Sequence, residues 1–416
     1  MEWNRKHYIG KLLFMKHATI IPLIGGEAIA SEKVFGTRPE YILSYSVFKN
    51  NEKHLLNYWN NEVPYHVLDE QPEHPFHLPK VDVMSSVCPC AGLSQFSMHF
   101  GEDNPNNQWM IKTAKHVLNE VKPRVFWGEN APGLAGNIGK FVRDELREIS
   151  LKAGYTFGLY RTGSLLHGVP QTRQRTFYFF WQGDRTPLLN YYNRPYTPIE
   201  EVISNVKSNS QMEPINTKTP SKDDPFYRYL LEVVYNGITH REFQDNLRQK
   251  NARTNDVQSF IERAGHTYKM MAEWMGKNGY ENQVEKCLRK HKKLVEDSGN
   301  IMRRGTIVPK DYIGAFVGHY PNSLTHPYED RYVTYREALT IMGMPDDFEL
   351  LDPKLSTNHI CQNVPVQTAI DMATEVKEAL EGNRNWLNAT YVYQNNNSQK
   401  YEIWDEQTSE NLERFF

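Results

Sequence analysis

Cysteine is scarce in this sequence: Cys88, Cys90, Cys287 and Cys361 are the only four among 416 residues. So few thiols at such wide spacing exclude a disulfide framework and indicate a reducing compartment, so a cytoplasmic protein is expected. The pair Cys88 and Cys90 has no further cysteine or histidine nearby at ligand spacing. A zinc site is therefore not expected, and no metal is assigned.

Long hydrophobic runs and an excess of one charge are also missing. No segment approaches the roughly 18 apolar residues that a membrane-spanning helix requires. The apolar run 18–24 contains Pro22 and leads into Gly25, which is typical of a buried strand entering a turn and not of a secretion signal. Basic and acidic residues number 48 and 50, a net charge of −2. This balance excludes a uniformly basic nucleic-acid coat but not a local basic patch.

Short apolar runs alternate with amphipathic stretches from residue 18 to about residue 182. The alternation predicts an α/β fold, a doubly wound and mostly parallel sheet with helices on both faces. Such sheets bind ligands at the carboxyl ends of their strands, so chemistry is expected in the turns that follow the strands. The predicted strands cover 19–24, 41–47, 81–87, 124–127 and 176–181, and the predicted helices cover 27–35, 52–60, 108–121, 138–153, 335–342 and 367–380.

The composition of the sequence changes after Gly183: prolines become frequent, and the alternation of apolar runs with amphipathic stretches ends. Residues 185–330 hold 21 basic and 18 acidic residues, and within them residues 248–310 hold 14 and 7. Taken alone, this basic stretch is more simply a solvated helix face than a binding surface. We expect a catalytic α/β domain over 1–184 that is closed by 355–382, a smaller inserted domain over 185–354 and a C-terminal tail over 383–416.

Three turns of the predicted sheet carry residues suited to chemistry. Cys90 follows Pro89 at a strand end, where a thiolate can face a ligand, although a lone buried cysteine is more often a small hydrophobe. Glu129 follows the next strand and is either a partly desolvated carboxyl that exchanges protons or a plain surface acid. Arg173 and Arg175, two residues apart on an extended chain, face the same side, so they either enter one site together or line a sheet edge.

The order of these motifs, Pro-Cys, then Glu-Asn, then Gln-x-Arg-x-Arg, resembles that of the cytosine-5 DNA methyltransferase family. The resemblance extends from about residue 20 to residue 380. It includes Gly25-Gly26 in the first turn and the stretches 331–338, 343–348 and 360–366. It implies the S-adenosylmethionine-dependent methyltransferase fold, with residues 185–354 as a target recognition domain.

The resemblance implies a role for each catalytic candidate. Cys90 adds to carbon 6 of a cytosine that is flipped out of the duplex, and carbon 5 then takes the methyl group of S-adenosyl-L-methionine. Glu129 binds ring nitrogen 3 and the exocyclic amine, while Arg173 and Arg175 orient Glu129 and bind the base carbonyl. The expected product is 5-methylcytosine in DNA.

The resemblance also implies which residues hold the cofactor. Gly25 and Gly26 let the backbone pass close to its methionine part, Pro89 closes the floor of the site, and Asp69 binds the adenine amine. The remaining positions that align with cofactor-binding residues are Ile21, Ser46, Gln362, Asn363 and Val364.

Several positions depart from the family pattern, and all but one cluster on cofactor binding; the exception is Ala91, which follows Cys90 where a glutamine is usual. Leu23 replaces the first glycine of the first turn, Ile21 replaces the aromatic residue that packs on adenine, and Ser46 stands where a ribose-binding glutamate is usual. The final Gly-Asn motif corresponds either to 361–362 or to 362–363. A modified sulfonium donor such as carboxy-S-adenosylmethionine is therefore an alternative to S-adenosylmethionine.

The inserted domain lies where the family carries its target recognition domain, and this location favours the basic stretch as a DNA contact surface. Double-stranded DNA is the expected partner of a monomer that binds no membrane, while a cognate restriction endonuclease, a phage role and a solitary role stay open. Two other functions also stay open: an inert DNA-binding relic, which the intact catalytic set disfavours, and a tRNA cytosine-5 methyltransferase, whose insert is shorter. The cations expected to contact DNA are Lys286, Arg289, Lys290, Lys292, Lys293, Arg303 and Arg304.

Overall fold

The computed structural model describes residues 15–70, 78–94, 101–207, 210–249, 256–301, 303, 305–309, 311–318 and 320–403. The chain divides into two compact units. The first unit combines Met1–Thr162, Gln174–Tyr192 and Val366–Phe416, and the second combines Gly163–Arg173 and Asn193–Pro365. Arg173 and residues 355–365, which the sequence placed with the catalytic domain, are thus grouped with the second unit.

The first unit contains a nine-stranded, mostly parallel sheet, which confirms the predicted fold class. Its strand order is β11-β10-β6-β7-β5-β4-β1-β2-β3. β1 pairs in parallel with β2 and β4, whereas β7 is antiparallel to β5 and β11 is antiparallel to β10. The strands are β1 (His17–Ile20), β2 (Ile42–Ser44), β3 (Tyr65–Val67), β4 (Val83–Val87), β5 (Val125–Asn130), β6 (Tyr155–Gly163), β7 (Gln174–Gln182), β10 (Tyr391–Asn395) and β11 (Lys400–Ile403); β8 (Thr186–Pro187) and β9 (Trp386–Leu387) form a separate pair.

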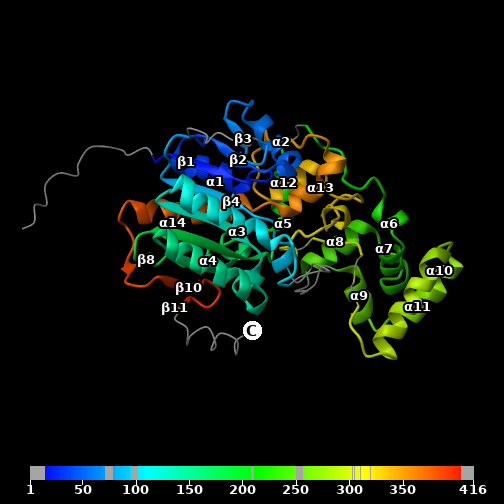
Figure 1. Cartoon of the computed structure of the whole chain (residues 1–416). Helices are drawn as coiled ribbons and strands as arrows, with labels where there is room; N and C mark the ends of the chain where they lie inside the picture. The colour runs from blue at the N-terminus through cyan, green and yellow to red at the C-terminus, as the bar shows by residue number, and fades with distance from the viewer. Residues whose placement is uncertain are drawn as a thin grey trace, which may run out of the picture. The chain divides into compact units, whose positions relative to one another are not determined.

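Helices cover both faces of this sheet (Figure 1). The chain runs from β1 to β2 in one direction along the sheet and from β4 to β5 in the other, so right-handed crossovers place their connecting helices α1 and α3 on opposite faces. α1 packs against α14, and α3 packs against α4. The order reverses between β1 and β4, the point at which doubly wound sheets bind ligands. These helices are α1 (Gly26–Phe35), α2 (Lys49–Tyr58), α3 (Asn107–His116), α4 (Lys140–Ala153) and α14 (Val366–Leu380).

Three parts of the sheet lie outside the predicted elements: the short edge strand β3, the strand β6 and the strands of the expected tail. Only one residue, Gly154, separates β6 from α4, and it ends the helix in the left-handed conformation (φ 79°). A turn of several residues, which would have marked the start of a strand in the sequence, is therefore missing between α4 and β6. The expected tail contains β9, β10 and β11, and β10 pairs in parallel with β6. The polar composition of this segment concealed the strands: β11 is a largely exposed edge strand, and β10 is a buried inner strand of only five residues.

The second unit is mainly helical. A continuous core lies among α7 to α11 and is formed by buried aromatic and aliphatic side chains such as Tyr227, Phe243, Ile261 and Met271. Helix α12, as predicted, begins with a capping box in which Thr334 and Glu337 exchange hydrogen bonds. The helices are α5 (Ile199–Ser204), α6 (Pro220–Asp223), α7 (Pro225–Tyr229), α8 (His240–Gln249), α9 (Val257–Arg263), α10 (Tyr268–Lys277), α11 (Glu281–Val295), α12 (Tyr335–Ile341) and α13 (Pro353–Gln362).

Two searches of the described residues bear on the class of protein. Within the described ranges, no helix is both long enough and apolar enough to cross a membrane. Nor do those ranges hold three or more His, Cys, Asp or Glu side chains grouped closely enough to bind a metal ion.

Candidate active site

Three of the predicted catalytic residues lie at one edge of the sheet in the first unit. β4 and β5 run in parallel with Val87 opposite Glu129, and Cys90 follows Val87 by three residues, so both side chains come from the carboxyl edge. β7 runs antiparallel to β5 with Phe177 opposite Glu129. Arg175, two residues before Phe177, therefore reaches the same edge. The register alone brings the thiol, the carboxylate and the guanidinium to one end of neighbouring strands.

Glu129 and Arg175 form a buried ion pair. The Arg175 Nε contacts the Glu129 Oε1, and the two side chains are only 12% and 3% exposed. Turning either group away from the other would leave a charge without its partner in a poorly solvated place, so the pair fixes the direction of the carboxylate. A carboxylate held in this way can accept hydrogen bonds from the N–H groups of a planar substrate.

Arg173 is oriented differently from Arg175. Its guanidinium is buried in the second unit, where Nη1 donates hydrogen bonds to the backbone oxygens of Phe316 and Cys361, each at 2.9 Å. These bonds tie the end of α13 to the segment around Phe316. The alternation of side chains along an extended chain predicted that both arginines face the same side. In the structure, Arg173 binds two backbone carbonyl oxygens of the second unit, whereas Arg175 binds Glu129.

The turns that carry Cys90 and Glu129 are in direct contact. A Cβ at Gly133 would lie 2.2 Å from the backbone oxygen of Leu93, so only glycine lets the turn after β5 approach the turn after β4 this closely. Asn130 adds a long hydrogen bond of 3.5 Å to the Cys88 oxygen and accepts one of 2.8 Å from the next backbone N–H. The two turns therefore move as one piece.

The two cysteines of the first turn have different surroundings. Cys88 is 2% exposed, its sulfur lies 3.3 Å from Ser86 Oγ and 3.9 Å from Tyr178 Oη, and burial raises the pKa of its thiol. Cys90 is only half-buried. Because a thiol must be accessible and ionised to act as a nucleophile, Cys90 is the better placed of the two.

The turn between β1 and α1 has an unusual backbone. Ile21 and Leu23 both adopt φ of 54°, and Gly25 adopts φ of 96°. A Cβ at Gly25 would lie 2.4 Å from Leu55 Cδ1, so the turn needs glycine there for both conformation and space. Leu23 holds a left-handed conformation without being glycine, which stores strain at this turn. Ile21, predicted to contact the cofactor, is fully buried.

Ser46 and Asp69, both predicted to hold the cofactor, are bonded to each other. The Ser46 backbone N–H donates to Asp69 Oδ1 at 2.8 Å, and its hydroxyl donates to Oδ2 at 2.9 Å. Partial burial acts to raise the pKa of Asp69, but the bonds from Ser46 hold it below the usual value. The pair links the carboxyl ends of β2 and β3. Both strands lie on the β1 side of the switch point, in the half of the sheet whose first connecting helix is α1.

An apolar surface next to Ser46 was not among the predicted residues. Val47 is 62% exposed although it is aliphatic. Tyr45 and Phe48 flank it, and each lies 5.0 Å from the ring of Trp109. The sequence shows apolar residues here, but only the structure reveals that Val47 is exposed while Tyr45 and Phe48 are buried.

The remaining predicted cofactor residues lie in the second unit at the end of α13. Gln362 is exposed, whereas Asn363 and Val364 are buried. The Asn363 amide donates a hydrogen bond of 3.1 Å to the sulfur of Met344. Gln362 is therefore the only one of the three with a solvent-accessible side chain.

Most of the predicted DNA-contacting cations lie on α11 in the second unit. Lys286, Arg289 and Lys293 are exposed there. Arg303 instead binds both carboxylate oxygens of Glu262, at 2.8 and 3.0 Å. Arg304 lies outside the described residues.

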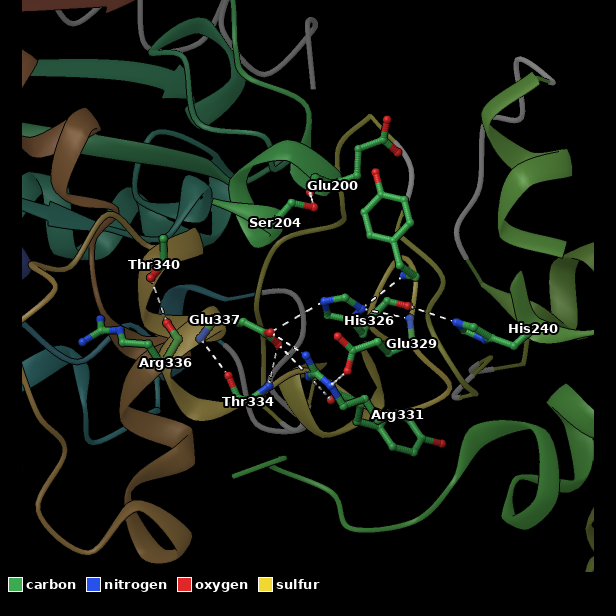
Figure 2. Close-up of polar contacts among 12 residues, drawn as sticks. Glu200, Ser204, His240, His326, Glu329, Arg331, Thr334, Arg336, Glu337 and Thr340 are labelled. Carbon is green, nitrogen blue, oxygen red and sulfur yellow. Dashed lines mark hydrogen bonds and ion pairs between the residues drawn. The ribbon is translucent and has the colours of Figure 1, made fainter. Parts of the chain in front are cut away.

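A buried polar network accounts for the motif at 331–338 (Figure 2). Glu337 accepts two hydrogen bonds from Arg331, at 2.8 and 3.0 Å, and one from the Thr334 backbone. His326 lies 3.7 Å from Glu337, and its backbone oxygen accepts a 3.1 Å hydrogen bond from His240 of α8. Burial lowers the pKa of His326 to about 4. This network joins α8 to the start of α12 within the second unit.

Two buried glutamates behind the first turn predict a pH-dependent stability. Burial raises the pKa of Glu27 to about 7 and that of Glu52 to about 8, although Thr19 and Ser85 donate to Glu27 and Tyr65 donates to Glu52. Between pH 5 and pH 8 these two carboxyls hold more protons in the folded chain than in the unfolded chain, so their contribution to stability falls as the pH rises. Buried histidines such as His326, whose pKa is lowered, contribute with the opposite sign below about pH 6.5.

The measurement is the melting temperature at pH 5.5 and at pH 8.5. Relative to the wild type, Glu27→Gln and Glu52→Gln should each shift the change in melting temperature from pH 5.5 to pH 8.5 in the favourable direction, because a neutral amide does not ionise. The exposed Glu120 supplies the control, and Glu120→Gln should keep the wild-type slope. Equal slopes in all four proteins would contradict the assignment of these groups.

The doubly wound sheet and the residues at its switch point define the class: the fold is that of the S-adenosylmethionine-dependent methyltransferases. Among solved structures, a proposed DNA modification methyltransferase of an Escherichia coli prophage superposes with a TM-score of 0.52 at 16% identity, covering 88% of this chain and 99% of that chain. The Entamoeba histolytica methyltransferase EhMeth gives a TM-score of 0.51 at 12% identity, with 88% and 98% covered.

The sequence profile described as C-5 cytosine-specific DNA methylase matches residues 25–378, and the chain belongs to this family. It is 24% identical over 285 residues to the Type II methyltransferase M.DdeI of Desulfomicrobium norvegicum, covering 64% of this chain and 63% of that protein. It is 25% identical over 337 residues to the Type II methyltransferase M.Bpa9945I of Bacillus paralicheniformis, covering 73% and 71%. The chain thus spans less than two thirds of the length of M.DdeI.

Proposed function

We propose that this protein is a DNA (cytosine-5)-methyltransferase that modifies double-stranded DNA. The buried ion pair between Glu129 and Arg175, at the sheet edge that also carries Cys90, is the observation that supports this function most strongly. A fixed carboxylate beside an accessible thiol suits a reaction that must both grip the amidine edge of cytosine and add a nucleophile to its ring.

Each residue of this edge has a defined task in the proposed reaction. The target cytosine is flipped out of the duplex, and Glu129 accepts a hydrogen bond from the exocyclic amine. It accepts a second one from ring nitrogen 3 once that nitrogen has taken up a proton, which happens as the thiolate adds to the ring. The Cys90 sulfur adds to carbon 6, which makes carbon 5 nucleophilic. After methyl transfer, a base removes the proton from carbon 5 and the Cys90 sulfur leaves carbon 6, which restores the aromatic ring. Arg175 holds Glu129 in place, and Arg173 positions the segment to which it is bonded.

The residues of the first unit fit a donor of the S-adenosylmethionine type, which supplies an electrophilic methyl group on its sulfonium. Gly25 supplies the left-handed backbone of the first turn, Gly26 opens α1, and Pro89 precedes the nucleophile. Ser46 and Asp69 offer hydroxyl and carboxylate oxygens to the nucleoside part. The strained turn at Leu23, where the sequence departs from the family, keeps a carboxylated donor open as the alternative.

The deciding experiment combines a covalent trap with product analysis. A duplex that carries 5-fluorocytosine at the target should leave Cys90 covalently bound, because the fluorine at carbon 5 cannot be eliminated as a proton. Nucleoside mass spectrometry of DNA from expressing cells should show 5-methylcytosine. A heavier group on carbon 5 would establish the carboxylated donor, trapping on tRNA alone would establish an RNA substrate, and neither adduct nor product would establish an inert DNA-binding protein.

The remaining expectations extend this proposal. The cations of α11 contact DNA phosphates, and residues 185–354 form the target recognition domain. The protein acts in the cytoplasm as a monomer. A cognate restriction endonuclease is its candidate partner, because the relatives M.DdeI and M.Bpa9945I are named as Type II methyltransferases.

A further inference from the structure

A lysine side chain lies at the switch point of the sheet in the first unit. Lys112 belongs to α3, the helix that connects β4 to β5, and its ammonium lies 4.2 Å from the ring centroid of Tyr45 and 5.1 Å from that of Trp109. Tyr45 comes directly after β2, on the other side of the switch point. The ammonium is therefore located where the two halves of the sheet meet, which is where doubly wound sheets bind their ligands.

Aromatic rings hold Lys112 in this position. Trp109 lies three residues before Lys112 on α3, so both side chains lie on one face of the helix. The Trp109 ring contacts the rings of Tyr45 and Phe48, with centroids 5.0 Å apart in each pair, and Tyr45 is only 2% exposed. Aromatic faces attract a cation and restrict the motion of a long side chain that is otherwise exposed to water. The position of this charge is thus set by the packing of α3 on the turn after β2.

Lys112 also acts on Asp69, which is bonded to Ser46. Burial raises the pKa of Asp69, but the hydrogen bonds from Ser46 lower it, and the positive charge of Lys112 lowers it further. This influence requires that the ammonium and the carboxylate lie near each other. Within the described ranges Lys112 forms no ion pair and no side-chain hydrogen bond, so its N–H groups can donate to a ligand.

The polar groups on this side of the switch point differ from the family pattern in the direction of their hydrogen bonds. Ser46 stands where a ribose-binding glutamate is usual, and its hydroxyl already donates to Asp69. A glutamate accepts hydrogen bonds from sugar hydroxyls, whereas an ammonium donates to their oxygens. Since a hydroxyl can both donate and accept, a lysine and a glutamate can bind the same sugar.

We propose that Lys112 binds the ribose hydroxyls of the methyl donor and takes over the task of the missing glutamate. The inference rests on the proposed function, since it takes a donor of the S-adenosylmethionine type as the ligand. Lys112 donates to the sugar from α3, while Asp69 accepts from the adenine amine at the carboxyl end of β3. The opposite charges of the two side chains keep both of them ionised when the ligand excludes water.

The test measures how Lys112→Met changes the affinity for S-adenosylhomocysteine and for its 2′-deoxy and 3′-deoxy analogues. Methionine keeps the length of the side chain but cannot donate a hydrogen bond. By titration calorimetry, the wild type should bind at least one deoxy analogue roughly tenfold more weakly than S-adenosylhomocysteine. In Lys112→Met, the affinity for S-adenosylhomocysteine should fall roughly tenfold, and the penalty for that missing hydroxyl should shrink to about twofold or less, because the lost partner no longer matters.

Two further variants serve as controls. Lys115→Met removes an exposed lysine from the same helix, on the side near Glu148 of α4, and should leave all three affinities at the wild-type level. Lys112→Arg should keep the penalty for the missing hydroxyl, because a guanidinium also stacks on aromatic rings and donates hydrogen bonds. If Lys112→Met weakens all three ligands equally, or weakens none of them, Lys112 does not bind the ribose and the proposal is overturned.

These measurements separate this proposal from the proposed function, because they need neither DNA nor turnover. A wild-type chain that binds S-adenosylhomocysteine and shows the expected loss in Lys112→Met, but leaves DNA unmodified, refutes methyl transfer alone. A chain that forms 5-methylcytosine while its penalty for a missing hydroxyl is the same with and without Lys112 refutes the role of Lys112 alone.

Discussion

Replacing Cys90 by alanine is expected to abolish product formation, with a loss of about three orders of magnitude or more in kcat, and to eliminate the covalent adduct with a 5-fluorocytosine duplex. The ring of cytosine is too poor a nucleophile at carbon 5 unless a thiolate first adds to carbon 6. Removing the nucleophile of an enzyme commonly leaves only the residual rate supplied by binding and orientation. The measurement is tritium transfer to DNA, together with a gel-shift assay for the adduct.

Cys88 supplies the matched control, since it belongs to the same turn but is buried beside Ser86 and Tyr178. Cys88→Ala should lower the melting temperature, because it leaves a small cavity, and should still form the adduct. DNA binding by Cys90→Ala should stay near the wild-type level, since the surface that holds DNA is intact. Adduct formation by the Cys90→Ala protein, or its loss in Cys88→Ala at a temperature where that variant is folded, would assign the nucleophile to the wrong cysteine.

The strands of the sheet could be predicted from the sequence where clear turns separate them, but their order could not. The alternation of apolar and amphipathic segments identified the elements around β1, β2, β4, β5 and β7, because each strand is buried and most end in a turn that contains glycine or proline. β6 was missed because a single glycine, Gly154, connects it to α4. β11 was missed because it is an exposed edge strand with a polar composition like that of a true tail. β10 is an inner strand, but its short apolar part lies within the same polar segment.

The candidate site could be predicted to the level of residue types but not of contacts. Period-two geometry placed Arg173 and Arg175 on the same side, yet β7 begins only at Gln174, so Arg173 lies before the strand and its guanidinium binds backbone oxygens. Nor does a sequence reveal that a position such as Ile21 takes a left-handed backbone and is buried. The bond between Ser46 and Asp69 joins the ends of two strands, and such pairing follows from sheet register, which a single sequence does not specify.

Replacing Glu129 by glutamine is expected to lower kcat by about two to three orders of magnitude while leaving a folded protein. The amide keeps the shape of the side chain but presents an N–H where the substrate also donates, so the contact that stabilises the developing charge is lost. Arg175→Gln is expected to be the more damaging change for stability, by about 3 to 5 kcal/mol, because it leaves a carboxylate that is only 3% exposed without its partner.

A double-variant cycle separates these two effects. Combining Glu129→Gln with Arg175→Gln should give a protein more stable than Arg175→Gln alone, since no unpaired carboxylate remains, yet equally inactive. The ion pair between Arg384 and Glu375 provides the control: its side chains are 12% and 0% exposed, it lies in the same unit, and it is not part of the candidate site. Arg384→Gln should destabilise the chain to a similar extent and still trap a 5-fluorocytosine duplex below its melting temperature. If Arg175→Gln traps as well as Arg384→Gln, then the Glu129 pair serves only the fold and has no part in holding the base.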